Sequence, residues 1–221
     1  MNGHQFTFGG ATLVALGSGA LYWPDRGLLV VSDLHLCKSE RMARRSGAQV
    51  PPYETQDTLA RLETDIEAVD ARQVLCLGDS FDDSAAACAL TDAEITWLTR
   101  LQAGRQWLWV EGNHDPGPLG LGGQHMGEAR IGSLTFRHIA QADGRAEVSG
   151  HYHPKARVRT RGGAISRPCF LVDRARLILP AYGTYTGGLR THDPALCALM
   201  GPEALAILTG PVARPVPMPR G

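Results

Sequence analysis

Residues with metal-binding side chains follow four hydrophobic segments of the chain, at the point where each segment ends. These short runs are Asp33-Leu34-His35, Gly78-Asp79, Gly112-Asn113-His114-Asp115 and Gly150-His151-Tyr152-His153. In open α/β sheets ligands bind outside the carboxyl ends of the strands, so we expect the four runs to converge on one place. Carboxylate oxygen, imidazole nitrogen and amide oxygen together suit Mn²⁺, iron or Zn²⁺. The sequence therefore predicts a metal site at this edge of a sheet.

The spacing inside two of the runs indicates that each holds a single ion. In an extended Asp33-x-His35 segment both side chains project to the same face, because strands alternate with a period of two. His151 and His153 repeat this arrangement. Each run alone has an ordinary interpretation, since an isolated Asp-x-His can be a solvated strand end and an isolated Gly-Asp pair a turn. Their combination in this order makes chance a poor explanation.

One more histidine, His138, is a candidate ligand because it ends the predicted strand Leu134–His138. Its rivals are His125, in a glycine-rich segment, and His192, near the C-terminus. Both rivals fit ordinary surface histidines, although His125 is within reach of the site if its loop moves.

Buried strands and amphipathic helices must position these residues. Continuous apolar runs predict strands, and a stripe at helical spacing with charges opposite predicts a helix. The expected order is strand Leu28–Ser32, helices Lys38–Ser46 and Asp57–Val69, strand Val74–Leu77, helix Thr91–Leu101 and strand Trp107–Val110. This alternation marks an α/β protein.

After Pro116 the sequence pattern changes from alternating strands and helices to a series of short strand-like segments. They are Ala129–Ile131, Leu134–His138, Glu147–Ser149, Ala156–Arg159, Cys169–Val172, Leu177–Leu179 and Ala204–Thr209. Residues 211–221 hold four prolines, which predicts an irregular tail. We expect a single domain over residues 1–221, built on two packed sheets.

Composition bounds the function and the location. Lys plus Arg equals Asp plus Glu at 22 each, so the chain lacks the basic excess of a protein that coats nucleic acid. Any nucleic-acid contact must then come from a local patch. Five cysteines without a CxxC pair argue against a disulfide framework and a zinc ribbon. With neither a signal peptide nor a run of ~20 apolar residues in view, we expect a cytoplasmic protein without a membrane segment.

The complete set of runs resembles the motif series of the calcineurin-like metallophosphoesterases. The series reads Asp33-x-His35, Gly78-Asp79-x-x-Asp82, Gly112-Asn113-His114-Asp115, His138 and Gly150-His151-x-His153. The resemblance implies a four-layer α/β/β/α sandwich and two divalent metal ions. It implies that Asp33, His35, Asp79 and His153 hold one ion, and that Asp79, Asn113, His138 and His151 hold the other. His114 would be the acid near the leaving oxygen, with Asp115 orienting it. The family often has Gly before its fourth-motif histidine, where this chain has Arg137.

A narrower resemblance points to the ligase-associated DNA-repair (PdeM-type) endonucleases. It rests on the segments Ser32–Leu36, Gly150–Pro154, Arg167–Phe170 and Leu179–Gly188, and on basic residues after the first motif. The resemblance implies a Mn²⁺-dependent nuclease for single-stranded DNA that works beside an ATP-dependent DNA ligase, a helicase and an exonuclease.

Basic and aromatic residues near the motifs have two interpretations each. Arg41, Arg44 and Arg45, at helical spacing, either bind substrate phosphates or form a solvated helix face. The alternating Arg157, Arg159 and Arg161 offer the same choice. Tyr182 and Tyr185 either stack on unpaired bases or pack within the protein.

Two alternatives to a DNA nuclease stay open. The same metal site serves a small-molecule phosphatase or a cyclic-nucleotide phosphodiesterase. A non-catalytic scaffold that has kept the fold is the third hypothesis, although such proteins lose metal ligands and this chain has every expected type.

Overall fold

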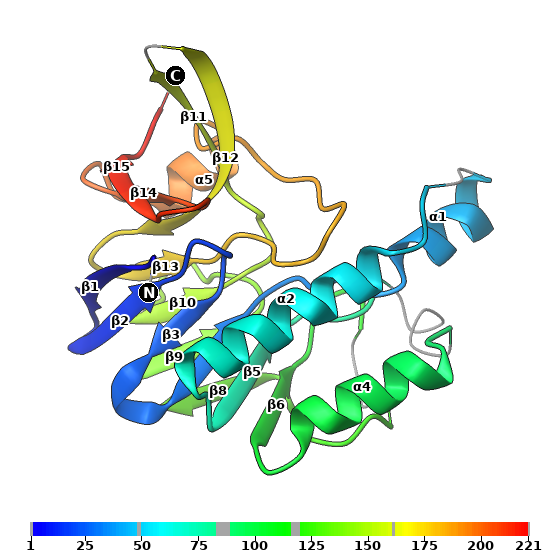
Figure 1. Ribbon diagram of the computed structural model, residues 1–221. Coiled ribbons are helices and arrows are strands. Elements are labelled where there is room, and N and C mark those ends of the chain that lie inside the picture. The colour runs from blue at the N-terminus through cyan, green and yellow to red at the C-terminus, as the bar shows by residue number, and fades with distance from the viewer. Residues whose placement is uncertain (1, 48–49, 83–88, 116–119, 161, 221) are drawn as a thin grey trace.

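Two sheets packed face to face, with helices on their outer sides, make up the protein. The computed structural model describes residues 2–47, 50–82, 89–115, 120–160 and 162–220. Arg161 and part of the glycine-rich segment after Pro116 lie outside the described residues. Figure 1 shows helices in front of the first sheet, and the second sheet extends from above it into the lower half of the view.

The first sheet has seven strands that lie in chain order. They are β1 (His4–Phe8), β2 (Ala11–Ala15), β3 (Leu21–Trp23), β4 (Leu28–Val31), β5 (Gln73–Leu77), β6 (Gln106–Val110) and β7 (Gln124–Met126). Strands β1 to β4 are antiparallel, and β4 to β7 are parallel. All four residues of β4 are buried, as expected for a continuous apolar run covered on both faces.

Helices α2 (Glu54–Val69) and α4 (Asp92–Gln102) cover the outer face of this sheet, and α1 (Lys38–Ser46) lies beyond the first turn of α2 (Figure 1). A short 3-10 turn, η1 (Pro24–Arg26), precedes β4. The stripe Leu59, Leu62 and Ile66 of α2 is buried in one apolar cluster with Val31 and Val74 of the sheet. The predicted helices are confirmed, and α2 begins three residues earlier than expected.

The second sheet has eight strands. They are β8 (Glu128–Ile131), β9 (Leu134–Arg137), β10 (Glu147–Ser149), β11 (Lys155–Thr160), β12 (Gly163–Val172), β13 (Arg176–Ile178), β14 (Leu205–Leu208) and β15 (Arg214–Pro217). The order is β15-β14-β12-β13-β10-β9-β8, and β11 pairs with the outer part of β12. Helix α5 (Pro194–Leu199) packs on the outer face through Leu196, which shares an apolar cluster with Cys169 and Leu171 of β12. The four-layer α/β/β/α sandwich is confirmed.

The main core lies between the two sheets. Leu13, Val30 and Leu75 of the first sheet share one buried cluster with Phe136 and Phe170 of the second. This packing fixes the position of one sheet relative to the other, and the strand ends of both sheets meet at the site described below.

The C-terminal segment differs from its prediction as an irregular tail. Residues Arg214–Pro217 form β15, which pairs antiparallel with β14. Proline removes a backbone donor and is confined to edge strands within sheets. Because β15 is the outermost strand, Pro215 and Pro217 are compatible with it, whereas composition alone suggested a loop.

Replacing Phe170 tests the inter-sheet core. Phe170 is fully buried between the sheets, and Phe170→Ala should lower the free energy of unfolding by roughly 3–5 kcal/mol, because it leaves a cavity. The same strand offers a control in Ile165, which is 39% exposed, so Ile165→Ala should change the value by less than about 0.5 kcal/mol. Urea denaturation followed by circular dichroism measures both. Equal losses from the two variants would contradict this account of the core.

Candidate metal centre

The four predicted runs meet at the carboxyl ends of strands from both sheets. Asp33, Asp79 and Asn113 follow β4, β5 and β6, which are parallel neighbours in the first sheet. His138 follows β9, and the pair His151 and His153 follows β10, in the second sheet. The seven candidate ligands therefore come from two sheets that pack against each other through the inter-sheet core.

One cluster joins Asp33, His35 and His153, whose candidate ligand atoms all lie within 4.8 Å of one another. His153 Nε2 lies 3.0 Å from Asp33 Oδ1 and 3.4 Å from His35 Nε2. Asp33 is fully buried. These three side chains form the first candidate metal site.

A second cluster joins Asp79, His138 and His151 in the same way. His138 Nε2 lies 3.3 Å from both Asp79 Oδ2 and His151 Nδ1, and 2.9 Å from Asn113 Oδ1. The two clusters are adjacent, since His138 Nδ1 lies 4.0 Å from Asp33 Oδ1. All seven predicted ligands are thus in the two neighbouring groups.

The hydrogen bonds of the rings leave acceptors facing acceptors. His138 Nδ1 lies 3.1 Å from the carbonyl oxygen of Leu77, which can only accept, so the ring proton is on Nδ1. In the neutral ring, which metal binding requires, His138 Nε2 is then an acceptor that faces two further acceptors, Asn113 Oδ1 and Asp79 Oδ2. Converging lone pairs repel one another unless a cation lies between them, and an N/O donor set suits Mn²⁺, iron or Zn²⁺. The residues therefore fit a pair of divalent metal ions.

Backbone conformation, and not strand alternation, brings the Asp-x-His and His-x-His pairs together. Asp33 and His35 have φ of 54° and 45°, and His151 and His153 have φ of 68° and 47°. The expectation of an extended segment was therefore wrong, although the side chains do converge. Each pair lies in a loop beyond the end of its strand, where residues in the left-handed region redirect the chain. Such sparsely populated conformations concentrate at functional sites.

Glycines let the two sheets approach at this point. A Cβ added to Gly78 would overlap the ring of His138, and one added to Gly150 would overlap Ser32 and press on Asp33. Gly78 also has a φ of 77°, which favours glycine. These glycines are therefore part of the architecture that places ligands from one sheet against the other.

Asp82 positions the first cluster, a role that the sequence analysis did not assign. Its Oδ1 lies 2.9 Å from His35 Nδ1, and His35 Nε2 faces His153. Its Oδ2 accepts a hydrogen bond from Arg41 at 2.7 Å. The signal was present in the run Gly78-Asp79-x-x-Asp82, because a second carboxylate three residues after a ligand remains close to the site.

Asp115 and His114 differ from the expected pairing. Asp115 Oδ2 accepts from the backbone N–H of Ser80 at 2.7 Å, and Oδ1 accepts from that of Gly112 at 3.1 Å. It ties two motif loops together and does not orient His114. The His114 ring is instead held by the carbonyl oxygen of Asp82, 2.8 Å from its Nδ1.

The electrostatics of the centre are those of a cation site. Burial opposes ionisation of Asp79, but His138 and His114 outweigh it and lower the pKa of Asp79 to about 2. The pKa of His138 is raised despite burial, because Asp79 and Asp33 attract its proton. The pKa of His151 is lowered by burial and by His138, which keeps this ligand neutral as metal binding requires. Burial raises the pKa of Asp115 to about 6.

A cleft of about 380 Å³ opens beside the second cluster and is lined by Asn113, Arg137 and His138 among others. Arg137 pairs with Glu128 at 2.9 Å, which also lines the cleft, and with Glu147 at 3.2 Å. A larger cavity of about 720 Å³ lies beside α5 and includes none of the candidate ligands. The smaller cleft is therefore the one that concerns the chemistry.

Two of the three predicted phosphate-binding arginines of α1 are paired with acidic side chains. Arg41 pairs with Asp82, and exposed Arg44 pairs with Glu40 at 3.1 Å. Arg45 is exposed on the same helix.

Comparison with known proteins gives concordant matches. The profile of the family described as calcineurin-like phosphoesterase matches residues 27–169, which include all seven candidate ligands. The chain is also similar to the crystal structure of Pseudomonas putida nuclease MPE. That similarity has 28% sequence identity and a TM-score of 0.75, and it covers 97% of this chain and 100% of the nuclease chain. No curated protein matches the sequence significantly. Among the described residues, no helix is long and apolar enough to cross a membrane.

Removing the charge of Asp82 tests its positioning role. Asp82→Asn should weaken Mn²⁺ binding by roughly 10- to 100-fold, the usual effect of losing a carboxylate behind a histidine ligand. Isothermal titration calorimetry measures this effect. Asp25→Asn, at an exposed carboxylate of η1, is the matched control and should bind Mn²⁺ like the wild type. Unchanged Mn²⁺ affinity in Asp82→Asn would show that Asp82 does not position His35 for metal binding.

The close approach at Gly150 gives a second test. Gly150→Ala should displace Ser32 and Asp33 and weaken Mn²⁺ binding by at least about 10-fold, comparable to other changes that misplace ligands. Gly187→Ala is its control, because an added Cβ there meets nothing within 4 Å. Metal content after dialysis, measured by mass spectrometry, compares the two. If both variants retain metal equally, the packing at Gly150 is irrelevant to the site.

Proposed function

Because the chain belongs to the calcineurin-like phosphoesterase family, a family of metal-dependent phosphoesterases, we propose that it is a two-metal endonuclease for single-stranded DNA. The family match spans both ligand clusters. The observation that carries the proposal is the adjacency of these clusters, built from seven side chains that the two sheets bring together. The similarity to a nuclease over nearly the whole chain supports a nucleic-acid substrate.

We assign Asp33, His35 and His153 to one metal ion and Asn113, His138 and His151 to the other, with Asp79 between them. When bound, two such ions supply the charge that activates a water and offsets the negative charge building on the phosphate. Mn²⁺ is the proposed metal on the strength of the narrower family resemblance, and iron or Zn²⁺ suits the same donors. The surrounding residues hold the ligands with their lone pairs directed inward.

His114 is the proposed general acid. Its Nδ1 donates to the carbonyl oxygen of Asp82, which leaves Nε2, 4.0 Å from Asp79 Oδ2, to carry the mobile proton. The side chain is 30% exposed, so it lies at the mouth of the site, where a leaving oxygen can depart. Proton donation of this kind contributes roughly 10²–10⁴ in rate.

The biological setting is part of the proposal. The narrower resemblance suggests a DNA-repair role in association with an ATP-dependent DNA ligase, a helicase and an exonuclease. The described cysteines are free thiols, which fits a reducing compartment such as the cytosol.

Circular single-stranded DNA with Mn²⁺ is the direct test, because only an endonuclease can open a circle. We expect linear products from the wild type and turnover of bis-p-nitrophenyl phosphate as well. Turnover of the small ester alone would replace the proposal with a small-molecule phosphodiesterase. If the metal-bound protein hydrolyses neither substrate, the result would favour the non-catalytic scaffold.

Asp79→Ala should abolish hydrolysis of both substrates, with a loss of at least about 10³-fold, since stabilisation by metal ions is worth several kcal/mol. Asp25→Ala is the control and should retain wild-type rates, because Asp25 is exposed and belongs to neither ligand cluster. Initial rates are measured after chelation and addition of fresh Mn²⁺. Full activity in Asp79→Ala would disprove the role given to Asp79.

A further inference from the structure

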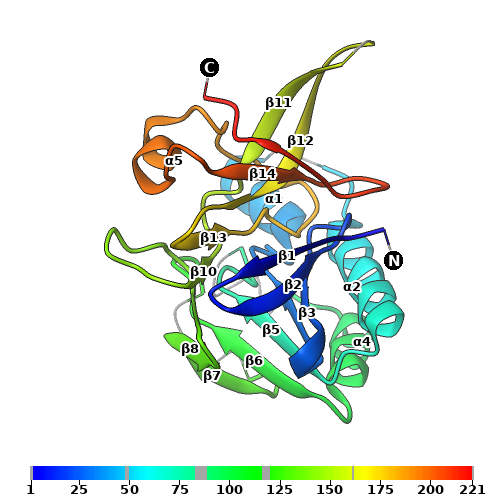
Figure 2. The same cartoon turned by 90° about the vertical axis from the view of Figure 1, so that its left-hand side faces the viewer.

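The β11–β12 hairpin is a basic ribbon that starts at the metal centre. It begins two residues after His153 and extends away from both sheets, as Figures 1 and 2 show. The sequence from Lys155 to Val172 contains no acidic residue. Arg157, Arg159 and Arg167 are exposed on it. The whole chain has no net charge, so the positive charge of this segment is a local concentration of basic residues.

Strand register places three of the basic residues on one face. Lys155, Arg157 and Arg159 alternate along β11, so their side chains share a face. Their partners on β12 have even numbers, as does Phe170, which lies in the core between the sheets. The basic face therefore continues the face of β12 that looks toward the first sheet. The opposite face carries Ala156 and Val158, which pack in the cluster beside α5.

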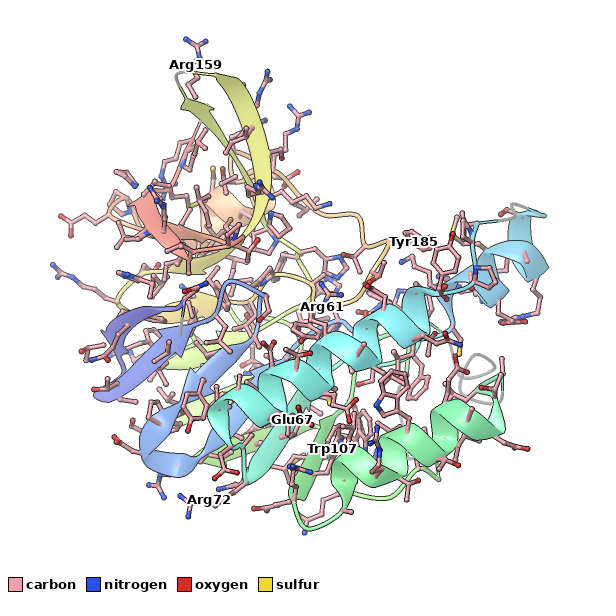
Figure 3. The ribbon with its side chains drawn as sticks, in the orientation of Figure 1. Arg61, Glu67, Arg72, Trp107, Arg159 and Tyr185 are labelled. Atoms are coloured by element: carbon pink, nitrogen blue, oxygen red, sulfur yellow. The ribbon has the colours of Figure 1, made fainter. Side chains whose placement is uncertain are left out.

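The guanidinium groups of this face are available for a ligand. Arg41 and Arg137 pair with buried carboxylates at 2.7 and 3.2 Å. In contrast, Arg157 and Arg159 make no ion pair with any part of the chain that the structure describes. Figure 3 shows Arg159 at the outer end of the hairpin, directed away from the protein body.

A second segment, the loop of residues 180–189, lies between this hairpin and the metal ligands. The backbone N–H of Gly183 donates to Asp33 O at 3.1 Å, and that of Leu189 donates to Tyr152 O at 3.2 Å. Lys155 Nζ donates to Thr186 O at 3.0 Å. The loop is thus attached to both ligand segments and to the base of the hairpin.

This loop exposes one tyrosine and buries another. Tyr182 is fully buried, its hydroxyl donates to Asp65 Oδ2 at 2.7 Å, and Arg61 lies 4.8 Å above its ring. Tyr185 is 41% exposed and has a φ of 63°, which a bulky residue rarely adopts. In Figure 3 Tyr185 lies at the outer edge of the loop, above the first turns of α2. A firmly attached loop that holds an aromatic ring outward in an unfavourable conformation is typical of a binding site.

We propose that Tyr185 and the basic face of the hairpin bind a single-stranded polynucleotide across the metal centre. Tyr185 stacks on an unpaired base, and Arg157 and Arg159 bind backbone phosphates on the hairpin side. Aromatic stacking combined with a basic track is the usual way to bind single strands without sequence preference. The inference rests on the proposed function, and it names the surface that would make the enzyme select single strands.

Binding of a fluorescent oligothymidylate, measured by anisotropy in a chelating buffer so that nothing is cleaved, tests the hairpin. The double variant R157A/R159A should bind roughly 10-fold more weakly, and the slope of log K against log salt should fall in magnitude by about 1.4, for two phosphates on a single strand. Arg174→Ala removes an exposed arginine that pairs with Glu203, and it should leave affinity and slope unchanged.

The stacking role has its own signature. Tyr185→Ala should weaken binding of the single strand by about 5- to 150-fold with no change in the salt slope. It should also reduce the preference for single strand over duplex. Tyr185→Phe keeps the ring and should bind like the wild type, which separates stacking from damage to the loop.

The outcomes are distinguishable from those of the proposed function. One outcome is that the wild type binds the oligonucleotide and cleaves circular DNA while R157A/R159A and Tyr185→Ala bind as tightly as Arg174→Ala. This result would contradict the proposed binding surface and support the proposed endonuclease activity. If the wild type neither binds the strand nor opens the circle, the nuclease fails and the surface with it. A loss in Tyr185→Phe equal to that in Tyr185→Ala would overturn stacking.

Discussion

The mutual repulsion of buried acceptor atoms is the constraint on which the structure depends. When the His138 ring is neutral and its Nδ1 donates to Leu77, lone pairs of His138, Asn113 and Asp79 face one another at about hydrogen-bond distance, and only an added proton or a bound cation relieves their repulsion. Such an arrangement is costly without a cation. The surrounding hydrogen bonds oppose its relaxation, since each turns a ligand so that its lone pair points inward. The centre is therefore preorganised for metal, with the unfavourable electrostatics carried by the rest of the fold.

Preorganisation requires both sheets. The first sheet contributes Asp33 and Asp79, and the second contributes His138 and His151. No local segment holds a whole cluster, so the apolar core between the sheets sets the distances between ligands. Five of the nine non-glycine residues with positive φ among those the structure describes are candidate ligands. This concentration indicates that packing energy elsewhere holds unfavourable backbone at the site.

The sequence predicts the identity of the ligands better than their local geometry. The ligands could be predicted because each run of ligand residues follows an apolar segment that predicts a buried strand, and parallel strands bring their carboxyl ends together. Period-two alternation gave the wrong backbone for Asp33 and His35, because loop conformations beyond a strand depend on tertiary contacts such as that between Gly150 and Ser32. Strand β15 was missed because proline content speaks against strands in general, whereas tolerance of Pro215 depends on its edge position. The role of Asp82 needed coordinates, since Asp79, Asp82 and Asp83 all follow β5 and their spacing does not rank them.

Division of labour among the arginines explains how a chain without net charge can act on a polyanion. Arg41 and Arg137 are drawn inward by buried carboxylates and stabilise the frame of the site, so they have little charge to offer a substrate. The hairpin carries its charge on a ribbon whose described residues 162–167 are all exposed, and an isolated two-stranded ribbon is only marginally stable. Its basic residues do not improve that stability, because like charges along one face repel. The same charges block edge-to-edge association with other strands. An exposed, self-repelling ribbon attached directly to His153 is easiest to understand if an anionic partner lies against it.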